Sequence, residues 1–392
     1  MITRLRVRNF KSIRSVDVSL PGLAVFVGEN GSGKSNLLDA LRFVKEALDD
    51  NLDHAIRERG GIAEVRRRSS GHPTHLSIDV DVSTQEVNAT YGFQIAAVAG
   101  GGYVVSREFC HIHEVSGSGP SGFEIENGVA VGESGLHAQV DARDLYLRAV
   151  SGVPPFASVY RALRSIGILN PNAGLLREYQ KPDASEYLSR DGRNLASIVK
   201  RMAERDPGSL DRVIAYLAKL VPGVRSVKHR QAGPRETLVF DQEWDNGAAW
   251  EFFATSMSDG TLRAVALLIA IQQEGVLTIG IEEPEVALHS GAARVLADAL
   301  VEASAGTQIV ITTHSPDLLD HEALARNGVF LVRMNRGVTT VEPMPAYLVH
   351  VVQEGLFTVG ELLRLGQLVA DPIVEVATEQ SLFGEAPVAG GQ

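Results

Sequence analysis

The sequence predicts an α/β fold that has a β-rich N-terminal part and an inserted helical lobe. Three observations lead to this prediction. A short apolar strand, residues 23–27, runs through a glycine-rich loop into a helix. Strand-like segments then continue to about residue 113, and the pattern turns helical from roughly 142 to 235. Apolar strands return near 276–282 and at 308–313, after a helix expected at 262–273, so the second half again combines strands with a helix.

Length and composition agree with a large α/β protein. The chain has 392 residues, of which 44% are hydrophobic, so it can bury a substantial core, and we expect two lobes. Its single cysteine, Cys110, excludes an internal disulfide framework. The charged opening residues and the lack of a long apolar run predict a cytoplasmic protein without a membrane partner. The net charge of −11 argues against general coating of nucleic acid.

Strand and helix signals divide the chain into four segments. We predict the first half of one domain at 1–141, a helical insertion at 142–235, the second half of the domain at 236–345, and a C-terminal extension and tail at 346–392. The expected strands are 2–8, 13–20, 23–27, 75–82, 89–98, 103–113, a run from 276 into the carboxylates near 282, and 308–313. The expected helices are 35–48, one from about 193, 209–220 and 262–273.

A phosphate-binding motif joins the strand at 23–27 to the following helix. It fits G-x-x-x-x-G-K-[ST], and the matching residues with their neighbour are Gly28, Glu29, Asn30, Gly31, Ser32, Gly33, Lys34, Ser35 and Asn36. Glycines let the backbone form a concavity of N–H donors, and the helix N-terminus adds positive potential. We expect Lys34 to reach the β- and γ-phosphates of ATP and the Ser35 hydroxyl to bind Mg²⁺. The alternative, a plain glycine turn, rarely has this full pattern with both flanks.

A second motif opens the helix expected at 262–273. Ser258, Asp259 and Gly260 place a capping serine, an acid and a glycine at a helix start, which makes another anion-binding N-terminus. An ordinary helix cap is the alternative, and it is the favoured one for this motif taken alone.

Two strands of the second half end in residues suited to hydrolysis. The first ends in Glu282, Glu283 and Glu285, and the next, 308–313, ends at His314. A carboxylate at the end of a strand beside a phosphate loop can hold Mg²⁺, and the next can orient and deprotonate the attacking water. We therefore assign Glu282 to the metal, Glu283 to the water and His314 to sensing the γ-phosphate. The alternatives are a solvated loop for the glutamates and a turn-capping imidazole for His314.

Together the motifs resemble the ABC-type ATPases of the RecF and SMC class, and more closely the stand-alone bacterial ATPases described as AAA-type or RecF-like. The segments that carry the resemblance are 7–13, 28–36, 188–195, 258–263, 281–285 and 312–316. It implies a P-loop NTPase fold of the ABC/RecF-SMC type that hydrolyses ATP with Mg²⁺. It also implies a homodimer in which ATP lies between the phosphate loop of one subunit and Ser258 and the Gly260 amide of the other.

The resemblance also suggests roles for single residues. Ser258, Asp259 and Gly260 would form the signature motif, with Glu282 in place of the usual Walker B aspartate, Glu283 as the catalytic carboxylate and His314 as the switch histidine. Lys11 and Ser12 would contact adenine, and a surface turn is the alternative for them. His289 is a weaker assignment than His314, because relatives tend to have Leu-His-Pro there. The Q-loop glutamine has no clear counterpart, since Gln94 lies in the middle of an expected strand.

Basic residues give the sequence hint of a polymer partner. Between 181 and 235, twelve basic residues stand against six acidic ones, an asymmetry typical of nucleic-acid binders. Arg4, Arg6 and Arg8 add a basic strand face, while an ordinarily solvated surface is the alternative. Two functions therefore stay open: a DNA maintenance or repair ATPase that closes on DNA as a dimer, and a regulatory or anti-phage defence ATPase that controls a protein effector.

Overall fold

The structure is a computed structural model that describes residues 1–68, 75–98, 100–114, 121–131, 140–243, 247–325 and 328–369. The described strands form a large mixed sheet and a small antiparallel one. The order across the large sheet is β8 (Val129–Ala130), β7 (Ser121–Glu126), β6 (Gly102–Glu114), β5 (Asn88–Val98), β4 (His75–Ser83), β1 (Ile2–Phe10), β2 (Ile13–Ser19), β16 (Val338–Pro343), β15 (Gly328–Asn335), β3 (Leu23–Val27), β14 (Gln308–Thr313), β13 (Thr278–Glu282) and β9 (Ile166–Leu169).

Strands β15, β3, β14, β13 and β9 run parallel to one another, and helices cover both of their faces. Strand β3 shows why, because all five of its residues are buried. Ala24 and Phe26 lie in the core that contains α1 (Lys34–Asp49), whereas Val25 and its alternate neighbours lie in the core that contains α9 (Asp259–Ile271). A strand that is apolar on both sides requires this two-sided cover.

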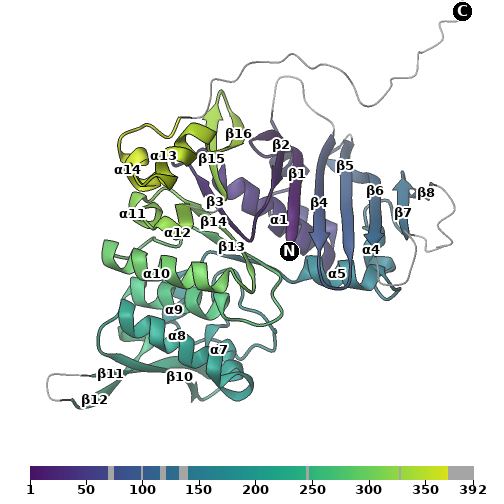
Figure 1. Ribbon diagram of the computed structural model, residues 1–392. Helices are drawn as coiled ribbons and strands as arrows, with labels where there is room; N and C mark the ends of the chain where they lie inside the picture. Colours follow the sequence, from purple (N-terminus) through teal and green to yellow (C-terminus); the bar gives the residue numbers. More distant parts are fainter. Residues whose placement is uncertain are drawn as a thin grey trace, which may run out of the picture.

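The remaining helices fall into three groups. Short helices flank the β-rich part: α2 (Leu52–Arg57), α3 (Ile62–Val65), α4 (Tyr146–Ala149) and α5 (Phe156–Arg164). Figure 1 shows a second group stacked beneath the sheet with α9. It comprises α10 (Ser290–Ala303), α8 (Pro207–Leu220) and α7 (Leu195–Arg205), with α6 (Ala173–Arg177) against α9. The third group follows β14 and comprises α11 (Pro316–Leu319), α12 (Glu322–Ala325), α13 (Ala346–Gln353) and α14 (Val359–Arg364).

The strands and helices expected from the sequence are present, but the expected helical pattern between 142 and 235 is wrong at two places. Strand β9 lies within it and pairs in parallel with β13 at the edge of the large sheet. Strand β10 (Val224–Ala232) begins a three-stranded sheet with β11 (Arg235–Glu243) and β12 (Ala249–Phe253). A four-residue apolar run such as β9 cannot be assigned from periodicity, because its distant partner β13 decides its conformation.

The cores of the two sheet faces differ in what they hold. Strands β1, β2 and β4 to β7 share one core with α1 and α5, while α7 to α10 and the C-terminal helices share the other. Among the described helices, none is long and apolar enough to cross a membrane. The carboxyl ends of the parallel strands and the loop between β3 and α1 lie at one edge of the sheet, where the predicted site residues gather.

Candidate nucleotide site

The loop between β3 and α1 forms a concave backbone suited to phosphate. Gly31 and Gly33 have φ angles of 79° and 99°, which side chains rarely tolerate. A Cβ atom at Gly33 would also lie 2.0 Å from the Thr339 hydroxyl. Helix α1 then begins at Lys34 without a side chain that caps its first N–H groups. Those donors are therefore available to an anion.

Lys34 is buried inside this loop. Its ammonium donates hydrogen bonds to the carbonyl oxygens of Gly28 at 2.7 Å and Glu29 at 2.9 Å. Burial lowers the pKa of Lys34, and nearby carboxylates, Glu283 first among them, oppose that shift. A buried cation held by two neutral carbonyls is incompletely compensated, so a phosphate oxygen would find a strong partner here.

Two hydroxyl groups of the loop differ in their surroundings. The Ser32 hydroxyl is buried without a hydrogen-bond partner, which leaves a donor for a phosphate oxygen. Ser35, in the first turn of α1, is exposed, as a ligand to a bound ion must be. Both observations fit the predicted binding of a nucleotide and its metal.

The two residues expected to contact adenine, Lys11 and Ser12, have different partners in the structure. Ser12 is joined to the loop, because its hydroxyl accepts a hydrogen bond from the Asn36 amide at 2.6 Å and lies 2.7 Å from the Thr339 hydroxyl. Lys11 instead pairs with Asp39 at 2.6 Å, on the second turn of α1. Ser12 therefore lies beside the phosphate loop, and Lys11 is already engaged by a carboxylate.

Glu283 and His314 meet at the ends of neighbouring strands. Glu283 follows β13, His314 follows β14, and 3.3 Å separate the Glu283 carboxylate from His314 Nδ1. Glu283 has a φ of 45°, and its N–H donates to the carbonyl of Thr312 at 2.9 Å. A left-handed conformation is costly for a residue with a side chain and persists where the surroundings enforce it, often at functional sites.

Glu285 is not a solvated loop residue, because it is buried beneath this pair. One oxygen accepts hydrogen bonds from the Thr313 hydroxyl at 2.6 Å and the His314 N–H at 3.4 Å. The other oxygen is buried without a partner. Glu285 thus fixes the end of β14 and positions His314.

Glu282 points toward β9, the strand that the sequence did not reveal. Its carboxylate pairs with the Arg190 guanidinium at 2.8 Å and lies 3.4 Å from the Asn170 amide. Arg190 belongs to the 188–195 segment of the resemblance and is one of the twelve basic residues between 181 and 235, but its pairing with a carboxylate of the site was not predicted. Asn170 directly follows β9, so this strand brings an amide side chain next to the Glu282 carboxylate. Gln94, the residue considered as the Q-loop glutamine, lies in the middle of β5.

The second predicted motif caps its own helix. The Ser258 hydroxyl accepts a hydrogen bond from the Thr261 N–H at 3.1 Å, and Asp259 pairs with Arg177 at 2.6 Å. A Cβ atom at Gly260 would lie 2.4 Å from the carbonyl oxygen of Ala287, so this position requires glycine. Helix α9 packs on the sheet face opposite α1, and Ser258 is exposed at its start.

Arg263 of α9 lies within electrostatic reach of the carboxylates, although no role was predicted for it. Its guanidinium donates to the carbonyl oxygen of Pro171 at 2.6 Å, next to Asn170. Burial lowers the pKa of Arg263, and the charges of Glu283 and Glu285 act in the opposite direction. The weaker assignment, His289, caps α10 through a 3.2 Å hydrogen bond from the Ala292 N–H.

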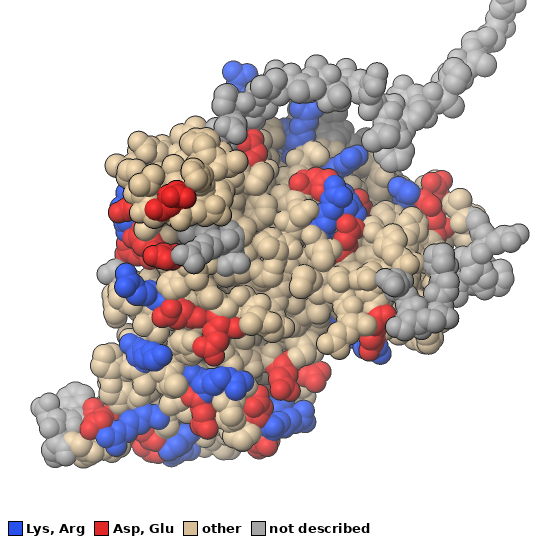
Figure 2. Space-filling view, in the orientation of Figure 1, with Lys and Arg blue, Asp and Glu red and all other residues tan. Residues whose placement is uncertain are grey.

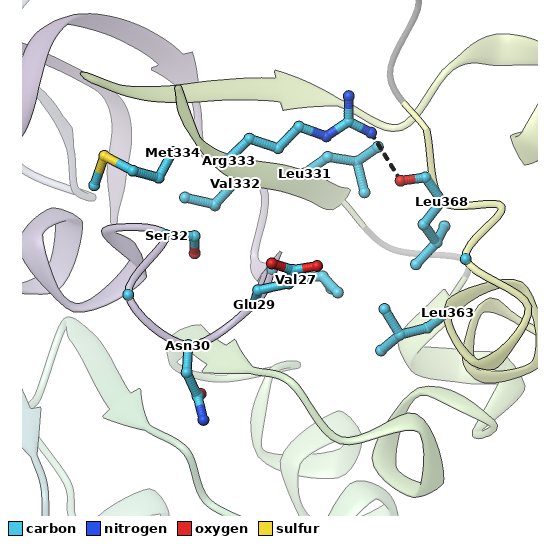
Figure 3. A pocket seen from close by; sticks show the side chains of 13 residues that line it. Val27, Glu29, Asn30, Ser32, Leu331, Val332, Arg333, Met334, Leu363 and Leu368 are labelled. Atoms are coloured by element: carbon cyan, nitrogen blue, oxygen red, sulfur yellow. Dashed lines mark hydrogen bonds between the residues drawn. The ribbon is translucent and has the colours of Figure 1, made fainter. Parts of the chain in front are cut away.

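A cavity of about 490 Å³ lies between the phosphate loop, β15 and the C-terminal residues that follow α14. Figure 3 shows loop residues such as Glu29 facing Leu363 and Leu368 across it, with the end of β15 above. Arg333 of β15 donates to the carbonyl oxygen of Leu368 at 2.8 Å. The C-terminal extension therefore forms one wall of the space beside the loop.

The basic surface expected at 181–235 is partly neutralised. Arg190, Arg225, Lys228 and Arg230 pair with acidic residues that lie outside that segment. Figure 2 shows blue and red side chains interspersed over the lower part of the molecule, where Figure 1 places α7, α8 and the β10–β12 sheet. The expected basic face of β1 is neutralised at two of its residues, because Arg4 pairs with Asp17, and Arg6 with Asp81 and Asp79, on neighbouring strands.

The donors present fit Mg²⁺ only together with a nucleotide. Among the described residues, no three His, Cys, Asp or Glu side chains cluster closely enough to hold a metal ion by themselves. Mg²⁺ usually binds one or two carboxylates and completes its shell with phosphate oxygens and water. Ser35 and Glu282 supply hard oxygen donors of the required kind.

Comparisons with known proteins agree with this arrangement. The family model described as "AAA domain, putative AbiEii toxin, Type IV TA system" matches residues 23–320. Chromosome partition protein Smc of Rhodopseudomonas palustris is 23% identical over 297 residues, which cover 70% of this chain and 23% of that protein. DNA replication and repair protein RecF of Clavibacter michiganensis subsp. michiganensis is 30% identical over 92 residues, which cover 22% of this chain and 23% of that protein.

The DNA double-strand break repair Rad50 ATPase of Halobacterium salinarum is 46% identical over 67 residues, covering 16% of this chain and 8% of that protein. The chain thus spans less than a quarter of the length of each of these relatives. A crystal structure of an Smc head bound to the C-winged helix domain of ScpA superposes with a TM-score of 0.54 at 16% identity. It covers 89% of this chain and 99% of that chain. This likeness confirms the predicted P-loop fold of the ABC/RecF-SMC type.

Proposed function

The chain belongs to the AAA domain family that matches residues 23–320, as a RecF/SMC-like ABC-type ATPase, and from this premise we propose a specific reaction and assembly. It hydrolyses ATP with Mg²⁺, closes as a dimer around two nucleotides, and serves DNA maintenance. The observation that carries the reaction is the contact between Glu283 and His314 at the ends of β13 and β14, because β14 pairs directly with the phosphate loop's own strand, β3.

Each step of hydrolysis has a residue suited to it. The loop N–H groups and Lys34 bind the phosphates, while Ser35 and Glu282 would hold Mg²⁺, which neutralises phosphate charge when bound. Glu283 accepts a proton from the water that attacks the γ-phosphorus, and the bond to the β-phosphate oxygen breaks to release ADP. His314 lies beside Glu283, where it can donate to the γ-phosphate and keep the carboxylate oriented.

Two substitutions test these roles by separating binding from turnover. We expect Glu283→Gln to bind ATP normally and to hydrolyse it about 10²–10⁴-fold more slowly, because the general base is lost. Lys34→Ala should weaken ATP binding itself by about 100-fold, since charge-assisted hydrogen bonds to phosphate are lost. Turnover by phosphate release and affinity by calorimetry give both numbers. Turnover of Glu283→Gln at the rate of the unmodified protein would exclude Glu283 as the base.

The DNA role is supported by the names of the relatives rather than by the lobe surface, which carries both charges. Lys200 and Arg205 of α7 are exposed, whereas Arg201 also bonds to the backbone carbonyl of Ser185. If α7 contacts DNA, Lys200→Glu with Arg205→Glu should weaken DNA binding and reduce the salt slope by about one unit per lost phosphate contact. Binding is measured from 50 to 200 mM salt with and without ATP, and Lys219→Glu on α8 is the control.

A salt-independent response of the unmodified protein would contradict DNA binding through phosphates. The partner would then be a protein effector. Equal weakening by Lys219→Glu would show that the effect comes from net charge and not from α7.

A further inference from the structure

Arg190 forms an ion pair with Glu282, the carboxylate that the proposed reaction uses to bind its metal. Arg190 Nη2 and Glu282 Oε1 are 2.8 Å apart, and the Asn170 amide donates to Glu282 Oε2 at 3.4 Å. Both oxygens of Glu282 are therefore occupied by donors from the protein itself. The Glu282 side chain is 14% exposed and that of Arg190 42%, so the cation covers the carboxylate from the solvent side.

The backbone keeps Arg190 at this position. Its carbonyl oxygen accepts a hydrogen bond from the Asn170 N–H at 2.8 Å, and the carbonyl oxygen of Asp191 accepts one from the Asn172 N–H at 3.0 Å. These bonds join the 190–191 turn to the segment that follows β9, and β9 is paired with β13, the strand that ends at Glu282. The backbone of Arg190 is thus fixed next to Glu282, while its side chain is exposed enough to move.

We propose that Arg190 competes with Mg²⁺ for Glu282, so that the metal enters this position only together with a nucleotide. The inference rests on the proposed role of Glu282. A guanidinium keeps its charge at every relevant pH and only donates, so a metal reaches the paired oxygen by displacing it. Without nucleotide, Mg²⁺ would gain little beyond this one carboxylate. With ATP, phosphate oxygens supply further ligands, so Mg²⁺ can replace Arg190 at Glu282.

The test measures the coupling between metal and nucleotide rather than turnover. The 392-residue chain is titrated with a fluorescent, non-hydrolysable ATP analogue in Mg²⁺ and again in EDTA. The dissociation constant in EDTA divided by that in Mg²⁺ reports how much the metal strengthens binding of the nucleotide. We expect Arg190→Gln to raise this ratio by about 2- to 5-fold, the range for releasing a partly exposed ion pair. Arg190→Lys, which keeps the charge, should leave the ratio near that of the unmodified protein.

The matched control is Arg193→Gln. Arg193 lies on the same turn and carries the same charge, but it pairs with Asp191. An equal ratio in Arg190→Gln and Arg193→Gln would overturn the competition, because only the general charge of the turn would then matter. Circular dichroism checks that each variant folds, and Arg190→Met, which also removes the charge, gives the comparison if the glutamine variant does not fold.

Glu282→Gln separates failure of this inference from failure of the proposed function. A ratio that falls toward one identifies Glu282 as a metal ligand, and then an unchanged Arg190→Gln overturns only the competition. A Glu282→Gln ratio equal to that of the unmodified protein would remove Glu282 from the metal site and overturn both.

Discussion

Two helix starts in this molecule have sequences suited to anions, but their surroundings differ. Helix α1 follows Gly33, and no side chain accepts a hydrogen bond from its first N–H groups. Helix α9 follows Ser258, whose hydroxyl caps the helix, and it carries Asp259 in its first turn. The start of α1 is therefore open to a phosphate, whereas at the start of α9 the Ser258 hydroxyl already accepts a hydrogen bond from the Thr261 N–H.

The difference teaches what each motif can do alone. The α1 loop places uncapped N–H groups, Lys34 and the Ser32 hydroxyl together in a single subunit, so we expect it to bind phosphate without a partner. The Ser258 hydroxyl can keep its cap and still donate to a phosphate when it accepts from both the Thr261 N–H and the Thr261 hydroxyl, which lies 2.9 Å away, because a hydroxyl accepts two hydrogen bonds and donates one. Asp259 is neutralised by Arg177, so it repels an incoming phosphate less. We infer that α9 acts on a nucleotide held by a second subunit.

The strongest test of this comparison is to block α9 and leave α1 intact. In Glu283→Gln with ATP and Mg²⁺, slow hydrolysis should preserve a dimer, because nucleotide bound between subunits stabilises the closed state. Adding Ser258→Arg should abolish that dimer while the affinity of each monomer for ATP changes little. Size exclusion with light scattering measures the mass, and calorimetry measures the affinity.

The control is Thr255→Arg, which adds the same charge at an exposed position just before the motif. Loss of the dimer in both variants would show that charge alone is responsible. A Glu283→Gln protein with one mass in the presence and absence of ATP would leave Ser258 as a helix cap only.

Contiguous features of the site could be predicted from the sequence. The phosphate loop is one unbroken motif, and Glu283 and His314 each follow a strongly apolar strand. Because parallel strands end at the same sheet edge, their proximity followed from the strand assignment. Their assigned roles stay predictions until the variants are measured.

The contacts that could not be predicted depend on long-range pairing. Asn170 follows a four-residue strand whose neighbour, β13, is more than a hundred residues away in sequence. Arg190 pairs with Glu282 instead of remaining in a solvated basic surface. Arg263 looked like an ordinary helix residue, because no local pattern shows that α9 turns it toward Pro171. Such contacts are decided by tertiary packing and leave no periodic signal.

A third helix start sharpens the comparison, because a carboxylate of the protein itself occupies it. Glu108 of β6 is buried and accepts hydrogen bonds from the N–H groups of Tyr146 and Leu147 at the start of α4, and from the Tyr91 hydroxyl at 3.0 Å. Burial raises the pKa of Glu108 to about 7, although these hydrogen bonds act in the opposite direction. Even a well-bonded anion is therefore costly at a helix start that water cannot reach.

This cost predicts a dependence of stability on pH. The folded protein holds a proton on Glu108 up to about pH 7, whereas the unfolded chain loses it near its ordinary value of 4.5. The contribution of Glu108 to the free energy of unfolding is therefore complete below pH 4.5 and declines as pH rises to about 7, by up to about 3 kcal/mol. In Glu108→Gln, which keeps one acceptor oxygen and cannot ionise, this part of the decline should disappear. Urea unfolding at pH 5, 6, 7 and 8 measures the difference between the two proteins, in which shared histidine titrations cancel.

The control is Glu124→Gln on the adjacent strand. Glu124 pairs with Arg107 at a partly exposed site, so this variant should keep the pH slope of the unmodified protein. Parallel slopes for Glu108→Gln and the unmodified protein would show that Glu108 is ionised in the fold, and that α4 tolerates a buried anion as readily as α1 is proposed to tolerate a phosphate.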